Sequence, residues 1–224
     1  MTNIPHYSIN DLCNVTSLLI KQKVKSIEVI LGVEVENKYH VFDNFGRLLF
    51  LAFERSNFWA RNCLGSQRAF EIFVTNPLSA VCFVCEREYT CCCAETVTVK
   101  SPFQQPIATV DRNFPPICKP DFTVKDALNK PILKIRGPVI TSSIFGGDVV
   151  FKIFSAAAPS VQIGKITKKY SGFFKEAFTD ADNFSIEMPF DLDVRFKAAL
   201  LGATFLIDFV FYESERQTNF IGNL

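Results

Sequence analysis

The sequence predicts a mainly β fold, a sandwich or barrel of about eleven or twelve strands, followed by one C-terminal helix. From Ser17 onward the chain is a succession of short runs rich in β-branched and aromatic residues, which is the composition of strands. Turn signals separate these runs at the regular spacing of all-β domains. Only the stretch from Val194 to Glu213 is long, apolar and free of strong helix breakers, as expected of a helix.

The expected strands are taken from alternating or continuous apolar runs. They occupy residues 18–24, 27–35, 38–42, 47–54, 69–74, 95–100, 106–111, 121–125, 131–137, 148–154 and 161–166. Dipeptides that favour turns, such as Asn76-Pro77, Gly137-Pro138 and Ala158-Pro159, lie between them. Twenty-four Phe residues and a hydrophobic fraction of 48% indicate a folded core built on aromatic rings.

The domain organisation that follows is simple. Residues 1–16 are polar without periodicity and are expected to form a flexible arm, residues 17–214 one domain, and residues 215–224 a short tail. The N-terminus lacks the basic start and apolar run of a signal peptide. The eight cysteines are therefore expected in a reducing compartment, without a disulfide framework.

The terminal helix can be buried in lipid or in protein, because it is apolar on all sides. Asp191 or Asp193 can cap it after Pro189. The 15 apolar-rich residues 198–212 cover roughly 22 Å, against the roughly 30 Å of a hydrocarbon core. Asp208 adds a cost of about 2–3 kcal/mol to membrane insertion. We therefore favour a core helix that fills a barrel over a membrane span. Its main apolar side chains are those of Ala198, Leu200, Phe205, Ile207, Phe209 and Phe211.

An acidic segment directly precedes this helix. If Asp180 is position 1 of a twelve-residue loop, Asp182 falls at position 3 and Asp191 at position 12, which is the spacing of EF-hand-type calcium loops. Position 5 is Phe184 and position 6 is Ser185 in place of the usual Gly. The segment is therefore a candidate for weak Ca²⁺ binding.

The same segment also has the pattern of a strand. Phe184, Ile186 and Met188 alternate with Ser185 and Glu187, as in a half-buried strand with acidic flanks. The residues alone leave the calcium loop and the strand as alternatives.

Five cysteines lie within twelve residues, at Cys82, Cys85, Cys91, Cys92 and Cys93. Cys82 and Cys85 have the spacing of a zinc knuckle, but neither histidine is near them in sequence. Cys91, Cys92 and Cys93 are candidates for reversible acylation. Inert buried thiols are the remaining alternative.

Basic and aromatic residues interleave from Lys165 to Lys175. Lys165, Lys168 and Lys169 can contact acidic headgroups or an import receptor, or they can line a solvated strand edge. A net charge of +1 gives no global attraction to nucleic acid, which we do not expect as a partner. The sequence has no G-x-S-x-G or phosphate-cradling motif, so neither a hydrolase nor a transferase is expected.

Several of these segments together resemble the phospholipid scramblase family. The matches include KIRGP at 134–138, GDVVFKI at 147–153, GKITKKYSG at 164–172 and the long block at 176–214. The resemblance covers roughly nine-tenths of the chain.

The resemblance implies a tubby-like closed antiparallel β-barrel that encloses a C-terminal hydrophobic helix. It implies Ca²⁺-dependent, ATP-independent, bidirectional movement of phospholipids between plasma-membrane leaflets, on the cytoplasmic face, with cytosol or nucleus as further locations. The implied calcium residues are Asp180, Asp182, Phe184, Ile186, Met188 and Asp191, and the implied acylated cysteines are Cys91, Cys92 and Cys93. Phospholipids and the membrane are the implied partners, and a homo-oligomer is compatible with them. The alternative function is a non-catalytic, lipid-anchored barrel that binds phosphoinositide or protein partners.

Overall fold

The structure is a computed structural model. It describes residues 9–23, 29–30, 33–34, 37–55, 69–89, 95–113, 120–139, 147–169 and 180–212.

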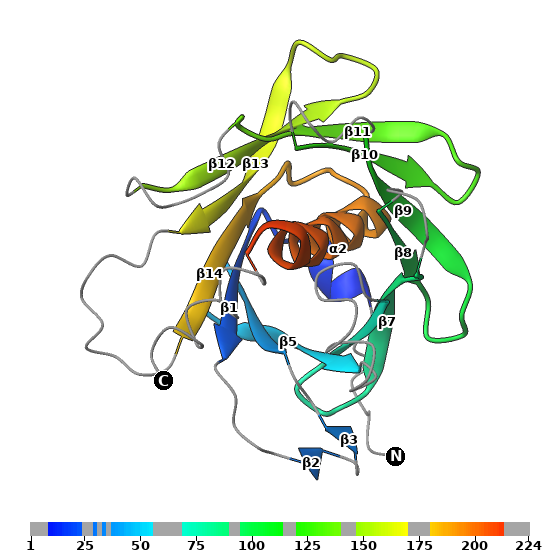
Figure 1. Ribbon diagram of the computed structural model, residues 1–224, viewed down its shortest axis with the longest axis vertical. Helices are drawn as coiled ribbons and strands as arrows, with labels where there is room; N and C mark the ends of the chain where they lie inside the picture. Colours follow the sequence, from blue (N-terminus) through cyan, green and yellow to red (C-terminus); the bar gives the residue numbers. More distant parts are fainter. Residues whose placement is uncertain are drawn as a thin grey trace.

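Twelve antiparallel strands close into a barrel (Figure 1). In chain order they are β1 (Ser17–Lys23), β4 (Lys38–Asp43), β5 (Leu48–Arg55), β6 (Phe70–Thr75), β7 (Val81–Arg87), β8 (Thr96–Lys100), β9 (Pro106–Arg112), β10 (Asp121–Asp126), β11 (Pro131–Arg136), β12 (Val149–Ser155), β13 (Gln162–Lys169) and β14 (Asp180–Glu187). From β4 to β14 each barrel strand pairs with the next one in the sequence. The barrel closes because β1 pairs with β4 on one side and with β14 on the other.

Side chains alternate between the inside and the outside of the barrel wall. On β1, Leu18, Ile20 and Gln22 are buried while the residues between them are half-exposed, and β4, β8 and β10 follow the same alternation. This period of two is what a sheet with one buried face requires. The predicted closed barrel of twelve strands is confirmed.

The α-helix of the described part of the chain, α2 (Val194–Phe211), runs through the middle of the barrel (Figure 1). Asp193 is its N-cap and accepts a hydrogen bond from the backbone N–H of Arg195 at 2.9 Å. Every residue from Phe196 to Phe209 is buried, so this stretch of the helix has no side that faces solvent and needs no polar face. The prediction of a core helix is confirmed, and no helix in the described part of the chain has the length and hydropathy needed to cross a bilayer.

Packing between helix and wall is close enough to favour a small residue at one position of the helix. A Cβ atom on Gly202 would lie 3.1 Å from Cγ2 of Val99 and 3.4 Å from Sγ of Cys85. Elsewhere aromatic rings fill the space between helix and wall: the ring centroids of Phe209 and Phe70 are 4.2 Å apart. The barrel interior is therefore a packed core.

Three segments differ from the expected element order. Val81–Arg87, read in the sequence mainly for its cysteines, is the barrel strand β7. The expected strand at 27–35 instead contains β2 (Val29–Ile30) and β3 (Val33–Glu34), which pair with each other in a separate two-stranded sheet. Within the expected N-terminal arm, Ile9–Leu12 forms the 3₁₀ helix η1, and Leu12 is buried in the core.

Candidate functional site

The enclosed helix is held at its N-terminal end by a buried lysine. The ammonium group of Lys197 donates hydrogen bonds of 2.9 Å to the backbone carbonyls of Cys13, Val15 and Phe190. Its side chain is fully buried, and this burial lowers the pKa of Lys197 below its usual value. Because all three acceptors belong to segments outside α2, this lysine ties the helix to the chain segments around it.

A second polar contact lies farther along the helix. The hydroxyl of Tyr39, on β4, donates a hydrogen bond of 2.7 Å to Oδ2 of Asp208, and both residues are buried. The ring of Tyr39 also packs against Phe205, with centroids 5.0 Å apart. Asp208, the acidic residue that interrupts the apolar segment, thus accepts a hydrogen bond inside the barrel, where burying a carboxylate without one would be costly.

Two basic residues pack against the C-terminal end of α2. The guanidinium of Arg112 lies 4.9 Å from the ring centroid of Phe211, and the ammonium of Lys168 lies 4.8 Å from that of Tyr212 and 5.0 Å from that of Phe184. Cations interact favourably both with aromatic faces and with the C-terminal end of a helix. The helix is therefore fixed by polar contacts at its start, along its length and at its end.

The predicted calcium segment lies on β14 and the turn after it. Phe184, Ile186 and Met188 point into the core and are buried, and the backbone of β14 pairs with β1 and β13 on its two sides. The strand alternative is the one that the structure shows. The side chains of Asp180 and Asp182 lie outside the described part of the chain, and Asp191 is exposed in the turn before α2.

The six residues do not surround one point in this arrangement. An extended strand rises about 3.3 Å per residue, so the backbones at the two ends of β14 are roughly 23 Å apart, whereas Ca²⁺ holds its ligands within about 2.6 Å. Among the side chains that the structure describes, no three His, Cys, Asp or Glu residues gather as metal ligands. With β14 in its closed pairing, this set does not fit a calcium ion.

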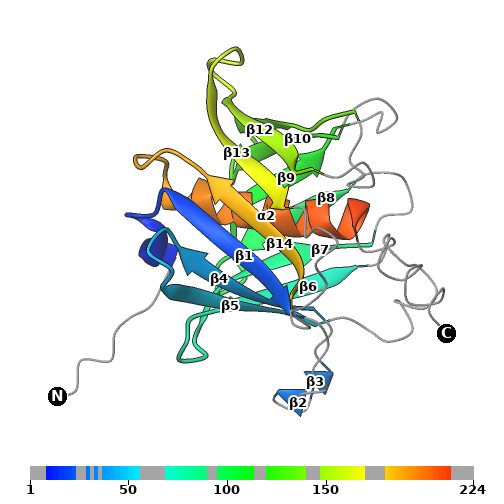
Figure 2. The ribbon, with the colours of Figure 1, turned by 90° about the vertical axis from the view of Figure 1, so that its left-hand side faces the viewer.

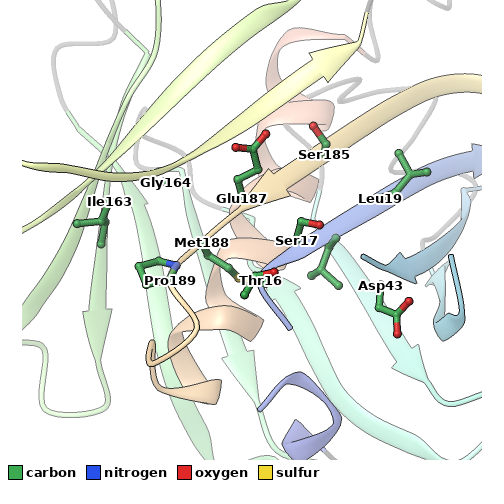
Figure 3. Close-up of a pocket in the computed structure, with 11 residues that line it drawn as sticks. Thr16, Ser17, Leu19, Asp43, Ile163, Gly164, Ser185, Glu187, Met188 and Pro189 are labelled. Carbon is green, nitrogen blue, oxygen red and sulfur yellow. The ribbon is translucent and has the colours of Figure 1, made fainter. Parts of the chain in front are cut away.

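The outer face of the same strand contributes to a pocket of about 680 Å³. It lies where β13, β14 and β1 meet the turn before α2 (Figure 3). Hydroxyls of Ser17 and Ser185 and the carboxylate of Glu187 line it beside the apolar side chains of Leu19 and Ile163. The pocket therefore has both polar and apolar walls.

Comparison with known proteins identifies the family. Residues 1–214 match the family model described as Scramblase. The chain belongs to the scramblase family. This scramblase-family chain is 38% identical over 208 residues to phospholipid scramblase 1 of Mus musculus, covering 90% of the chain and 62% of that protein. It is 38% identical over 211 residues to phospholipid scramblase 2 of Homo sapiens, covering 92% and 70%. It is 35% identical over 202 residues to phospholipid scramblase family member 5 of Homo sapiens, covering 88% and 73%.

The chain spans about two-thirds or less of the length of the phospholipid scramblase 1 proteins it matches, 62% for the mouse protein and 65% for the human one. The match therefore concerns the barrel domain of this scramblase-family chain, and says nothing of the parts that the longer relatives carry in addition.

The three predicted basic residues of this scramblase barrel face different environments. Lys165 and Lys169 are on the outer face, where their ammonium groups lie 3.1 Å from Glu187 and 2.7 Å from Asp148. Lys168 points inward and is buried. The outward lysines are half-exposed ion pairs, as expected of a solvated strand, while Lys168 belongs to the contacts of α2.

Cysteines 91–93 of this scramblase barrel lie outside the described residues, so their acylation stays a prediction. Cys82 and Cys85 are buried on β7. Burial raises the pKa of the Cys82 thiol to about 11 and raises that of Cys85 further. Both thiols are buried, and among the described side chains no three His, Cys, Asp or Glu residues gather as metal ligands, which favours the inert-thiol alternative.

Two contacts of the scramblase helix are absent from the sequence-based expectations. The bond between Tyr39 and Asp208 joins residues 169 positions apart, and only the position of Asp208 in an apolar run indicated that it needs a partner. Lys197 is buried, although lysine side chains usually reach solvent. The chain segments that supply its three carbonyl partners were not recognisable from the sequence.

Proposed function

We propose that this barrel moves phospholipids between the two leaflets of a membrane, in both directions and without ATP. Family membership over residues 1–214 carries the proposal, together with relatives named phospholipid scramblases that are up to 38% identical. Phospholipids are therefore the proposed substrates, and the cytoplasmic face of the plasma membrane is the proposed location.

The enclosed helix is the element that such an activity has to move or bypass. In the closed barrel α2 fills the interior from Phe196 to Phe209, which leaves no route for a headgroup along the barrel axis. A lipid path through the protein therefore needs α2 to leave the core, at the cost of its contacts through Lys197 and Asp208. A path along the outer wall would instead use the pocket lined by Ser185 and Glu187.

Calcium dependence is part of the proposal and rests on the family resemblance of the acidic segment. Because the closed β14 does not present those residues to one ion, we derive no step through calcium. Its contribution is measured directly by comparing exchange with and without Ca²⁺, in the wild type and in Asp180→Ala/Asp182→Ala.

The test is reconstitution of the purified chain in vesicles that carry a fluorescent phospholipid. Dithionite bleaches only the outer leaflet, so lipid exchange appears as bleaching of the inner-leaflet pool. We expect exchange without ATP and more of it with millimolar Ca²⁺. A chain that inserts into the vesicles but does not raise exchange above that of protein-free vesicles at millimolar Ca²⁺ would refute the proposal.

A second function is supported by the sealed interior. A barrel whose centre is packed is suited to binding on its surface, as a lipid-anchored module for phosphoinositides or protein partners. The outward lysines Lys165 and Lys169 are its candidate contacts. Binding to phosphoinositide vesicles that is unchanged in Lys165→Gln/Lys169→Gln would exclude this version.

A further inference from the structure

Four hairpin turns of the barrel are built in the same way. They connect β4 to β5, β6 to β7, β8 to β9 and β10 to β11, and they span residues 43–47, 76–80, 101–105 and 126–130. In each turn the N–H of the fourth residue donates to the carbonyl of the first, at 2.9–3.0 Å. The fourth residue has a positive φ: 76° at Gly46, 66° at Ser79, 64° at Gln104 and 64° at Asn129. This is a type I turn followed by a left-handed residue.

The third residue of every one of these turns is a large apolar side chain that faces solvent. Phe45 is 84% exposed, Leu78 61%, Phe103 87% and Leu128 88%. Single exposed apolar residues are ordinary on protein surfaces. The same choice at the same position of four independent turns, where nothing in the turn geometry requires it, indicates a shared role.

All four turns lie at one end of the barrel. Strands of an antiparallel barrel reverse direction at each connection, so alternate connections share an end, and these four are alternate connections between β4 and β11. The chain segment before β1 and the connection from β14 to α2 lie at this end too (Figure 2). That connection adds Phe190, which is 61% exposed. We call this end, defined by the turns at 43–47, 76–80, 101–105 and 126–130, the turn rim.

The rim is uncharged at its tips. None of the three loop residues of any of the four turns is charged. The flanking carboxylates serve the turn itself: Oδ1 of Asp43 accepts from the N–H groups of Phe45 and Arg47 at 2.9 Å, and Oδ1 of Asp126 does the same for Leu128 and Lys130. Backbone N–H groups near these tips are thus already bonded within the protein, which lowers the cost of moving them out of water.

We propose that the turn rim inserts its apolar side chains into the interfacial region of a lipid bilayer and so docks the barrel on the membrane by one end. Successive turns are two strands apart, at least roughly 10 Å, so their side chains form separate points. A rigid protein partner would need a matching hollow for each point, whereas fluid lipid closes around separate side chains. The turns belong to eight consecutive strands of the twelve, so they span an arc wide enough to set the tilt of the barrel.

Docking by this end has a consequence for the enclosed helix. The N-terminal end of α2 lies at the same end of the barrel as the turn rim (Figure 2). The rim therefore places the start of the helix, and the pocket lined by Met188 and Pro189, at the membrane surface. The proposal does not depend on lipid transport, because a barrel that docks through the rim and moves no lipid would retain it.

The test is flotation of the purified chain, made in bacteria so that its cysteines are not acylated, with phosphatidylcholine vesicles and without Ca²⁺. We expect binding by the wild type. Phe45→Ser/Phe103→Ser should lower the partition coefficient by roughly 25-fold, about fivefold for each partly buried ring. The matched control is Tyr89→Ser/Val139→Ser, which removes side chains that are 51% and 72% exposed at the opposite end of the barrel and should bind as the wild type does.

A second measurement reports insertion itself. Phe103→Trp in a Trp59→Phe background should give tryptophan fluorescence that shifts to the blue on adding vesicles and is quenched by brominated lipid. Three outcomes overturn the proposal: a wild type that does not float, a rim variant with unchanged binding, or a control pair that loses as much as the rim pair. A concentration-dependent oligomer that the rim variant dissolves, without vesicle binding, would assign the rim to a second copy of the chain instead.

Discussion

The bond between Tyr39 and Asp208 gives the sharpest stability prediction. Tyr39→Phe removes one oxygen and leaves the ring in place, so the change isolates the hydrogen bond. The O–O distance of 2.7 Å and the burial of both partners place the loss at about 1–3 kcal/mol of the free energy of unfolding. For a domain of this size, that lowers Tm by roughly 2–12 °C.

Urea unfolding at pH 7, with the m-value held as a check on the two-state description, measures this loss. Tyr89→Phe is the matched control, because Tyr89 is half-exposed beyond the end of β7, and it should stay within about 0.5 kcal/mol of the wild type. If Tyr39→Phe and Tyr89→Phe unfold at the same urea concentration, the bond does not hold the helix and the reasoning fails.

The same substitution connects stability to the proposed function. If lipid exchange requires α2 to leave the barrel, each loss of about 1.4 kcal/mol that falls on the closed state alone raises the population of the open barrel tenfold. Tyr39→Phe should then speed exchange in the vesicle assay, whereas a lipid path along the outer wall would leave the rate of exchange unchanged.

Three further predictions concern other parts of the barrel. Gly164→Ala would place a Cβ atom 2.2 Å from the carbonyl oxygen of Glu187 and should lower the free energy of unfolding by at least about 2 kcal/mol. Gly202→Ala would place its Cβ atom 3.1 Å from Val99 and should be near neutral, because the gain in helix propensity of about 1 kcal/mol offsets the close contact. Equal losses of the two variants in thermal denaturation would contradict this contrast. Maleimide at pH 7.5 should label exposed Cys13 in the native chain and should label Cys82 and Cys85 only after denaturation, as measured by peptide mass spectrometry. Labelling of Cys85 in the native chain at the same rate as Cys13 would contradict this and show that the barrel strands separate. Burial raises the pKa of Asp43, but hydrogen bonds from the N–H groups of Arg47 and Phe45 and from the Arg47 guanidinium outweigh this effect, so the pKa is lowered from 3.8. The carboxylate therefore contributes stability above its unfolded-state pKa, and this stability is lost as the pH falls through its folded-state pKa. Asp43→Asn should accordingly show a smaller drop in Tm than the wild type on acidification from pH 7 to pH 3.

Local patterns predicted the barrel well because its strands obey a simple period. The alternation at 38–42 or 121–125 needs only one buried face, and a period of two records that face in the sequence. The helix was predictable from length and uniform hydropathy, and the usual preference at the cap position narrowed its N-cap to Asp191 or Asp193, of which the structure shows Asp193. The location of α2 inside the barrel followed from the shortness of its apolar segment.

The parts that could not be predicted depend on contacts between distant segments. β7 was missed because its residues do not alternate: all four residues from Cys82 to Cys85 are buried, so the run lacks the period of two that marks the other strands. The inward orientation of Lys168 depends on the register of β13 against β14, which the sequence does not state. The turn rim could not be predicted from the sequence, because Phe45 and Phe103 lie far apart along the chain. Only the barrel topology places them at one end, and only the structure shows that their side chains are exposed.

The order of elements along the chain has a consequence for biosynthesis. A ribosome makes all twelve wall strands before it makes the helix around which they pack. Until α2 emerges, nothing covers the apolar inward faces of the strands. The nascent chain is therefore prone to aggregation and to chaperone binding for nearly the whole of translation. A chain truncated shortly before Val194 would therefore have all twelve strands but no core helix, and we expect it to be degraded in the cell like a chain that lacks several strands.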